Sequence, residues 1–119
     1  MKILIVDDSG TMHKIIKNQL ANAGIDESVD AFDGEDGLTK LESEMPIDVV
    51  LLDINMPKMD GMTMLRKVRS ESRYSGVKIV MVTSESEKSK VLEALRAGAN
   101  DYIVKPFQAE DFKERLRVS

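Results

Sequence analysis

Short apolar segments that alternate with longer amphipathic segments restrict the fold of this chain more than any other feature. Four of them are rich in β-branched or aromatic residues and are too short for helices, which is typical of strands buried on both faces of a parallel sheet. These segments are residues 3–6, 49–52, 79–82 and 102–104. A fifth strand is predicted at residues 29–32, where Val29 and Ala31 alternate with Asp30. Such alternation favours a half-exposed strand at an edge of the sheet.

Helical periodicity fills the intervals between these strands. The first predicted helix has one apolar face, made of Met12, Ile15, Ile16, Leu20 and Ala23. Ser9 or Thr11 is expected to cap its start, and Gly24 to follow its end. Further helices are predicted around residues 38–45, 62–68, 91–95 and 112–116. The fourth of the five is expected to bury Val91, Leu92 and Leu95.

Five strand–helix units in succession predict right-handed crossovers and a parallel α/β sheet covered by helices on both faces. The 119 residues correspond to one domain, residues 1–119. The chain has no cysteine and one histidine, which excludes a disulfide framework and a cluster of His ligands. A net charge of −4 argues against duplex nucleic acid as a partner. No apolar run could cross a membrane, so we expect a cytoplasmic protein. The net charge of −4 and a single compact domain favour a monomer.

Polar residues follow the strands at the points where the strands end. Asp7 and Asp8 follow the first strand, Asp53 the third, Thr83 the fourth and Lys105 the fifth. Ligands of open parallel sheets bind at these carboxyl ends. Three close carboxylates repel one another by about 4 kcal/mol per pair at an effective dielectric constant near 20. Either they are loop acids that cap helices and face water, or they bind a hard cation such as Mg²⁺.

A carboxylate beside Mg²⁺ can also act as a nucleophile and form an aspartyl phosphate. Phosphoryl transfer requires positioning and neutralisation of charge on the phosphoryl oxygens. Lys105 offers a compact positive charge and Thr83 offers a hydroxyl donor. No general base is needed, because an aspartate is ordinarily ionised at neutral pH.

Five sequence motifs at strand ends occur in the order that is typical of one family. With them, the chain resembles the receiver domain of two-component response regulators, in particular the single-domain chemotaxis type. The motifs are residues 3–9, 52–61, 82–84, 97–104 and 105–107, and the resemblance covers essentially the whole chain. It implies a flavodoxin-like (βα)5 fold with the strand order 2-1-3-4-5.

The resemblance also implies a role for individual residues. Asp53 would accept the phosphoryl group, and Asp7, Asp8, Asp53 and the backbone carbonyl of Asn55 would bind Mg²⁺. Thr83 and Lys105 would contact the phosphoryl oxygens, and Tyr102 would act with Thr83 as a conformational switch. The bond before Pro106 would be cis, which proline tolerates at a cost of about 0.5–1 kcal/mol.

Two other positions carry expectations from the residues themselves. Gly61 is expected to allow a left-handed or crowded turn. His13, which stands where an arginine is common in similar chemotaxis regulators, is expected to be an exposed residue of the first helix.

The predicted function is a phosphorylation-controlled signalling protein rather than a conventional turnover enzyme. A CheA-like histidine kinase would donate the phosphoryl group, and the face formed by the fourth helix, fifth strand and fifth helix would bind a target such as the flagellar motor switch. A partner phosphatase is a further candidate. The alternatives are a phosphorelay intermediate, the receiver part of a larger regulator, or a phosphatase with an aspartate nucleophile. Phosphatases of that kind usually carry Asp-x-Asp and a cap domain, for which 119 residues leave no room.

Overall fold

The computed structural model of the chain describes residues 1–56 and 59–116. Five parallel strands form one sheet in the order β2-β1-β3-β4-β5, so the predicted fold class and strand order are confirmed. The strands are β1 Lys2–Val6, β2 Glu27–Ala31, β3 Val49–Asp53, β4 Lys78–Thr83 and β5 Asp101–Val104. The α-helices are α1 Gly10–Asn22, α2 Gly34–Ser43, α3 Gly61–Arg69, α4 Val91–Arg96 and α5 Ala109–Leu116. Two 3₁₀ turns, η1 Ser72–Tyr74 and η2 Glu85–Lys90, precede β4 and α4.

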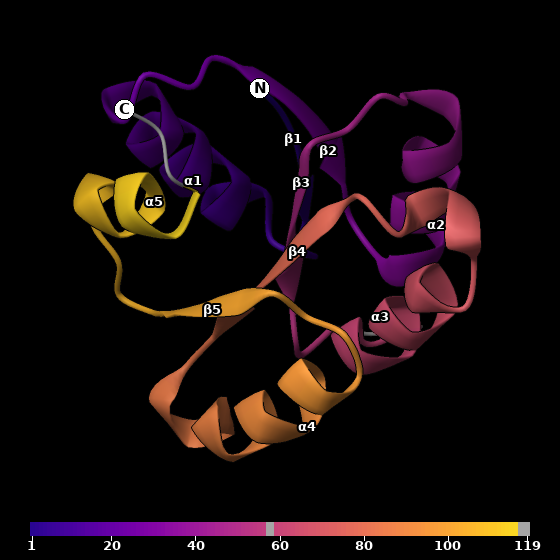
Figure 1. Cartoon of the computed structure of the whole chain (residues 1–119). Coiled ribbons are helices and arrows are strands. Elements are labelled where there is room, and N and C mark those ends of the chain that lie inside the picture. Colours follow the sequence, from indigo (N-terminus) through magenta and orange to yellow (C-terminus); the bar gives the residue numbers. More distant parts are fainter. Residues whose placement is uncertain (57–58, 117–119) are drawn as a thin grey trace.

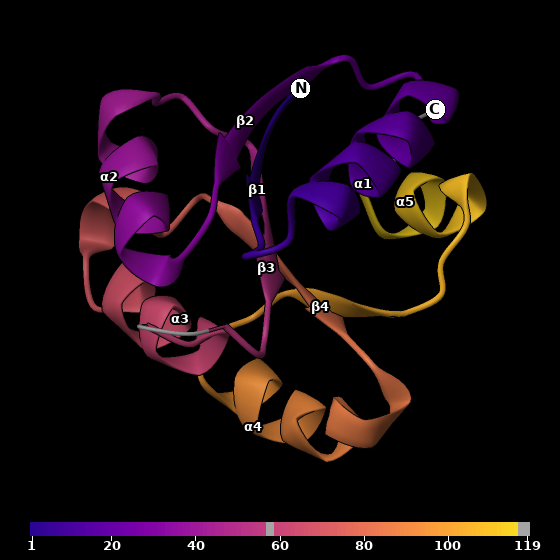
Figure 2. The ribbon, with the colours of Figure 1, turned by 180° about the vertical axis from the view of Figure 1, so that it is seen from behind.

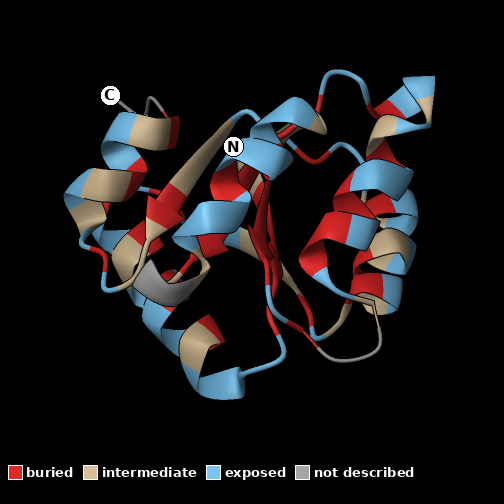
Figure 3. Cartoon of the chain, turned by 90° about the horizontal axis from the view of Figure 1, so that it is seen from below, coloured by how far each residue is buried: buried red, intermediate tan, exposed pale blue. Residues whose placement is uncertain are grey.

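The helices cover the sheet in two layers. Helices α1 and α5 lie side by side on one face, and α2, α3 and α4 cover the other (Figures 1 and 2). Alternate residues of the central strands supply two separate cores, because successive side chains of a strand point to opposite faces. Ile3 and Ile5 pack towards α1 and α5, whereas Leu4 and Val6 pack towards α2 and α3. Buried residues therefore run through the middle of the molecule, with exposed residues on the outer helix faces (Figure 3).

The ends of the elements follow the local signals in the sequence. The Ser9 side chain caps α1 by accepting a hydrogen bond from the backbone N–H of Met12. Gly24 and Gly98 have φ values of 86° and 114°, the left-handed conformation that commonly ends a helix. No helix in the described part of the chain combines the length and the apolar character that crossing a bilayer demands.

Two predicted helix faces are partly wrong. In α1 the buried residues are His13, Ile16 and Leu20, whereas Ile15 is exposed. The buried stripe is therefore rotated so that a polar residue occupies a core position. Helix α4 has six residues and buries Val91 and Ala94, while Leu92 is 57% exposed and Leu95 is also exposed. The small Ala94 packs in the core beneath α4, and the bulkier leucines are exposed.

Candidate functional site

The predicted site residues lie around the carboxyl ends of the central strands. β1 and β3 are neighbours, with Val6 opposite Leu52, and therefore the acidic residues that follow Val6 lie beside Asp53. This is also where the strand order reverses, because the chain crosses from β2 over β1 to β3. The same local pattern places each of these side chains at the sheet edge: the apolar run of the strand ends at the edge of the core, and a polar residue comes next.

Three carboxylates meet at this edge. Asp7, Asp8 and Asp53 each offer an oxygen, and these oxygens all lie within 4.8 Å of one another. Asp7 and Asp53 are only 2% and 5% exposed, whereas Asp8 is exposed. The structure thus brings Asp53 beside Asp7 and Asp8, which precede it by 45 or more positions in the sequence. Repulsion within such a cluster calls for a compensating positive charge.

Asp7 has an unsatisfied oxygen that fits a bound cation. Its Oδ1 accepts a hydrogen bond from the backbone N–H of Ser9 at 2.8 Å. Its Oδ2 is buried and has no hydrogen-bond partner among the described residues. Burial, supported by the nearby Asp8 charge, raises the pKa of Asp7 against the opposing effects of the Ser9 amide and Lys105. A buried oxygen without a donor is costly, and beside two other carboxylates it suits a hard cation such as Mg²⁺, which takes oxygen ligands.

Asp53 lies beside the only cation of the predicted site. Its Oδ1 is 3.8 Å from Nζ of Lys105 and accepts a long hydrogen bond, 3.4 Å, from the backbone N–H of Asn55. Burial raises the pKa of Asp53 to about 6, and Lys105 lowers it less than burial raises it. Above pH 6 the side chain is therefore mostly a carboxylate, which is the form that can attack phosphorus.

Thr83 and Tyr102 lie on the same face of the sheet. Met81 is opposite Tyr102 in the β4–β5 register, and Thr83 follows Met81 by two residues. Thr83 is fully buried and its hydroxyl donates to the backbone oxygen of Ser84 at 3.1 Å. Tyr102 is half-buried, and the guanidinium carbon of Arg115 lies 5.9 Å from its ring centre.

Backbone constraints shape the loops around Asp53. The Lys105–Pro106 peptide bond is cis, as the resemblance predicts, and the Lys105 N–H donates to the Thr83 carbonyl at 2.7 Å. A Cβ atom on Gly61 would lie 2.2 Å from the backbone oxygen of Asp53. Gly61 thus serves a crowded turn rather than a left-handed one. Pro57 and Lys58, which belong to the same motif, lie outside the described residues.

Two residues near the site were not predicted from the sequence. His13 was expected at the surface, but it is 3% exposed and its Nε2 lies 2.8 Å from the backbone oxygen of Asp7. The spacing of His13, Ile16 and Leu20 along one helix face could have revealed this burial. Glu87 is close enough to raise the pKa of Asp53, and its carboxylate accepts a hydrogen bond from Ser84 Oγ. No pattern in the sequence marks Glu87.

Comparison with known proteins agrees with this geometry. The family model of the response regulator receiver domain matches residues 3–117. Chemotaxis protein CheY1 of Helicobacter pylori is 45% identical over 118 residues, which cover 99% of this chain and 95% of that protein. Chemotaxis protein CheY of Pseudomonas aeruginosa is 44% identical over 116 residues, 98% of this chain and 93% of that protein.

Solved structures show the same similarity in three dimensions. Chemotaxis protein CheY4 of Vibrio cholerae matches with a TM-score of 0.86 and 36% identity, covering 99% of this chain and 98% of that one. A response regulator from Chloroflexus aurantiacus matches with a TM-score of 0.89 and 31% identity, covering 98% and 93%. The chain belongs to the response regulator receiver family. Within that family, its curated relatives of 41–45% identity are named as chemotaxis proteins of the CheY type.

Proposed function

We propose that residues 1–119 form a single receiver unit that accepts a phosphoryl group on Asp53 and acts as a signalling protein of a chemotaxis-like two-component system. The observation that carries this proposal is the convergence of Asp7, Asp8 and Asp53, with Lys105 Nζ 3.8 Å from Asp53. The fold alone would not support it, because one fold serves many functions and the site decides between them.

The chemistry follows from the residues in place. The Asp53 carboxylate attacks the phosphorus of a phosphohistidine on a CheA-like kinase. A bond forms between Asp53 and phosphorus while the bond from phosphorus to the imidazole nitrogen breaks, and the imidazole keeps that electron pair. Lys105 holds its ammonium beside the incoming charge, and the Thr83 hydroxyl turns from the Ser84 carbonyl to donate to a phosphoryl oxygen.

The cluster also suits Mg²⁺. Asp7, Asp8, Asp53 and the backbone carbonyl of Asn55 would hold the ion, and the unpartnered Oδ2 of Asp7 supports this assignment. When bound, the ion would supply the positive charge that offsets repulsion between the carboxylates and the phosphoryl oxygens. Asp53 is buried, so the chain itself excludes most water from the nucleophile.

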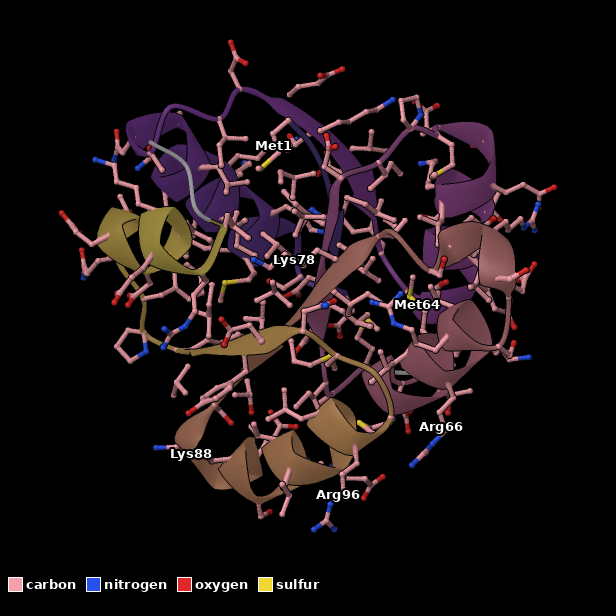
Figure 4. All side chains as sticks on the ribbon, viewed as in Figure 1. Met1, Met64, Arg66, Lys78, Lys88 and Arg96 are labelled. Atoms are coloured by element: carbon pink, nitrogen blue, oxygen red, sulfur yellow. The ribbon has the colours of Figure 1, made fainter. Side chains whose placement is uncertain are left out.

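The output would come from the face of α4, β5 and α5. Movement of Thr83 towards the phosphoryl group would vacate space on the side of the sheet where Tyr102 is half-buried, and Tyr102 would turn inward. On α4, Leu92 and Leu95 are exposed and Arg96 points into solvent, as does Lys88 of the preceding η2 turn (Figure 4). A mixed apolar and basic surface suits docking to another protein, such as the flagellar motor switch.

The setting and the remaining partners follow from the same proposal. The protein would work in the cytoplasm as a monomer, with a partner phosphatase as a further candidate. It would receive and lose its phosphoryl group without conventional turnover. A phosphatase with an aspartate nucleophile would instead hydrolyse phosphate esters in proportion to enzyme concentration.

Phosphorylation by a small donor tests the proposal. Wild type and Asp53→Ala are incubated with acetyl phosphate and Mg²⁺, and Asp26→Asn, a change at an exposed loop residue, serves as the control. We expect one phosphoryl group on wild type and on the control, and none on Asp53→Ala. Equal labelling of all three proteins would refute Asp53 as the acceptor. Steady turnover of a phosphate ester would favour the phosphatase, and an unchanged Tyr102 NMR signal with beryllofluoride would refute the switch.

A further inference from the structure

The single histidine of the chain occupies a buried polar position between α1 and β2. Both ring nitrogens of His13 face oxygen atoms: Nε2 lies 2.8 Å from the backbone oxygen of Asp7, and Nδ1 lies 2.8 Å from Oδ1 of Asp30. The ring also packs against Phe32, with the ring centres 4.4 Å apart. This arrangement fixes both the position and the orientation of the imidazole.

Asp7 is held through almost all of its polar atoms. Its backbone N–H donates to the Ala31 carbonyl, its carbonyl oxygen faces His13, and its Oδ1 accepts from the Ser9 N–H. Oδ2 is the buried exception. The peptide that carries the carboxylate is therefore clamped on both sides, and His13 provides the clamp on the side that leads into the β1–α1 loop.

Asp30 in turn holds His13. Its second carboxylate oxygen, Oδ2, accepts a hydrogen bond from Lys17, one turn further along α1, and its backbone oxygen accepts one from Lys40 of α2. Burial alone would raise the pKa of Asp30, but the hydrogen bonds from Lys17 and His13 hold it below its ordinary value. Asp30 therefore stays ionised and connects β2 with α1, through His13 and Lys17, and with α2, through Lys40.

Packing alone does not call for a histidine here. Ile16 and Leu20 fill the following positions on the same face of α1 with apolar side chains. A buried imidazole must instead satisfy its nitrogens, because an unpaired polar group in the interior costs free energy. In this structure Nε2 lies beside the backbone oxygen of Asp7, a residue of the acidic cluster, and Nδ1 lies beside the Asp30 carboxylate.

We propose that His13 is a positioning residue for the magnesium site: it holds the Asp7 carbonyl so that the Asp7 carboxylate stays oriented towards the cation. The inference rests on the proposed magnesium site. Removal of a group that hydrogen-bonds to a metal ligand and orients it lowers metal affinity about 10- to 100-fold.

The test compares Mg²⁺ affinity with stability in three variants of the metal-free chain. His13→Phe keeps a ring in the same position but removes both nitrogens. His13→Arg replaces the ring with a guanidinium that offers several donors in one plane to the same two oxygen atoms. Ile16→Val, one turn away on the same face, removes a methyl group from the core between α1 and α5. Calorimetric titration with MgCl₂ gives the dissociation constant, and thermal unfolding in EDTA gives the stability.

We expect His13→Phe to weaken Mg²⁺ binding about tenfold or more, and His13→Arg to restore most of the affinity. Ile16→Val should lower the melting temperature and leave the dissociation constant unchanged. Equal Mg²⁺ affinity in wild type and His13→Phe would overturn this inference and leave the proposed function standing. Weak binding that His13→Arg does not restore would also overturn it, since the donors would then not matter. A wild-type protein that does not bind Mg²⁺ would overturn the proposed function and this inference with it.

A second variant covers the case in which His13→Phe does not fold. Asp30→Asn keeps the imidazole but removes the charge that anchors it, and Lys17→Met removes the outer partner of Asp30 only. Asp30→Asn should weaken Mg²⁺ binding more than Lys17→Met does. Unchanged affinity in Asp30→Asn would refute the chain of contacts from β2 to Asp7.

Discussion

The replacement Asp53→Asn should stabilise the metal-free protein at neutral pH. Asp53 is buried beside Asp7, and burial is the largest cause of its raised pKa. An ionised Asp53 therefore costs the folded state free energy that the unfolded chain does not pay. Asparagine has nearly the same shape and no charge, so it removes this cost while the loop keeps its packing.

The size of the effect follows from the two pKa values of Asp53. The pKa rises from an ordinary 3.8 to about 6 in the folded chain. At about 1.4 kcal/mol for each pKa unit, this corresponds to about 3 kcal/mol. Because the folded state holds the proton more tightly, stability is lost as pH rises from about 4 through 6, and the loss is complete above pH 6. A gain of this size is a large fraction of the stability of a small domain.

Urea unfolding in EDTA at pH 7.5 and pH 4.5 measures this effect. We expect Asp53→Asn to exceed wild type by about 3 kcal/mol at the higher pH and by much less at the lower pH. Asp26→Asn, an exposed loop substitution, should change the free energy of unfolding little at either pH. A gain for Asp53→Asn that is absent at pH 7.5, or that does not shrink at pH 4.5, would refute the electrostatic reasoning.

Three further perturbations test other parts of the site. Mg²⁺ at 100 times its dissociation constant should raise the free energy of unfolding by about 2.7 kcal/mol, and a melting temperature that does not respond to Mg²⁺ would contradict the cation site. Gly61→Ala should cost about 1–3 kcal/mol because its Cβ would meet the Asp53 carbonyl. Gly76→Ala has open space, so equal urea midpoints for the two alanine variants would contradict the crowding. Lys105→Met should raise the pKa of Asp53 further, because Lys105 lowers it, and an unchanged carboxyl titration by NMR would count against their contact.

The fold could be predicted because the strands are short, apolar and regularly spaced. Residues 3–6 and 49–52 lie entirely within β1 and β3, and each observed strand exceeds its prediction by one residue. The carboxylate cluster could be anticipated for the same reason, because parallel strands end at one edge of the sheet and Asp7 and Asp53 directly follow the apolar runs.

Other features depend on tertiary contacts that periodicity does not encode. The nitrogens of buried His13 lie 2.8 Å from oxygen atoms of Asp30 and Asp7, and both partners lie on other strands or loops. On α4 the core side is taken by Val91 and Ala94, which leaves Leu92 exposed. Glu87 influences Asp53 through space, from a 3₁₀ turn that no spacing in the sequence predicts.

A crystal structure of the chain with Mg²⁺ and beryllofluoride would show whether Asp53 is the phosphoryl acceptor beside a cation. We expect a beryllium atom bonded to an Asp53 carboxylate oxygen, with Lys105 and Thr83 contacting its fluorides. We also expect one Mg²⁺ ion ligated by Asp7, Asp8 and Asp53. Beryllofluoride bound elsewhere, or Mg²⁺ absent from these three carboxylates, would refute the proposed phosphorylation site.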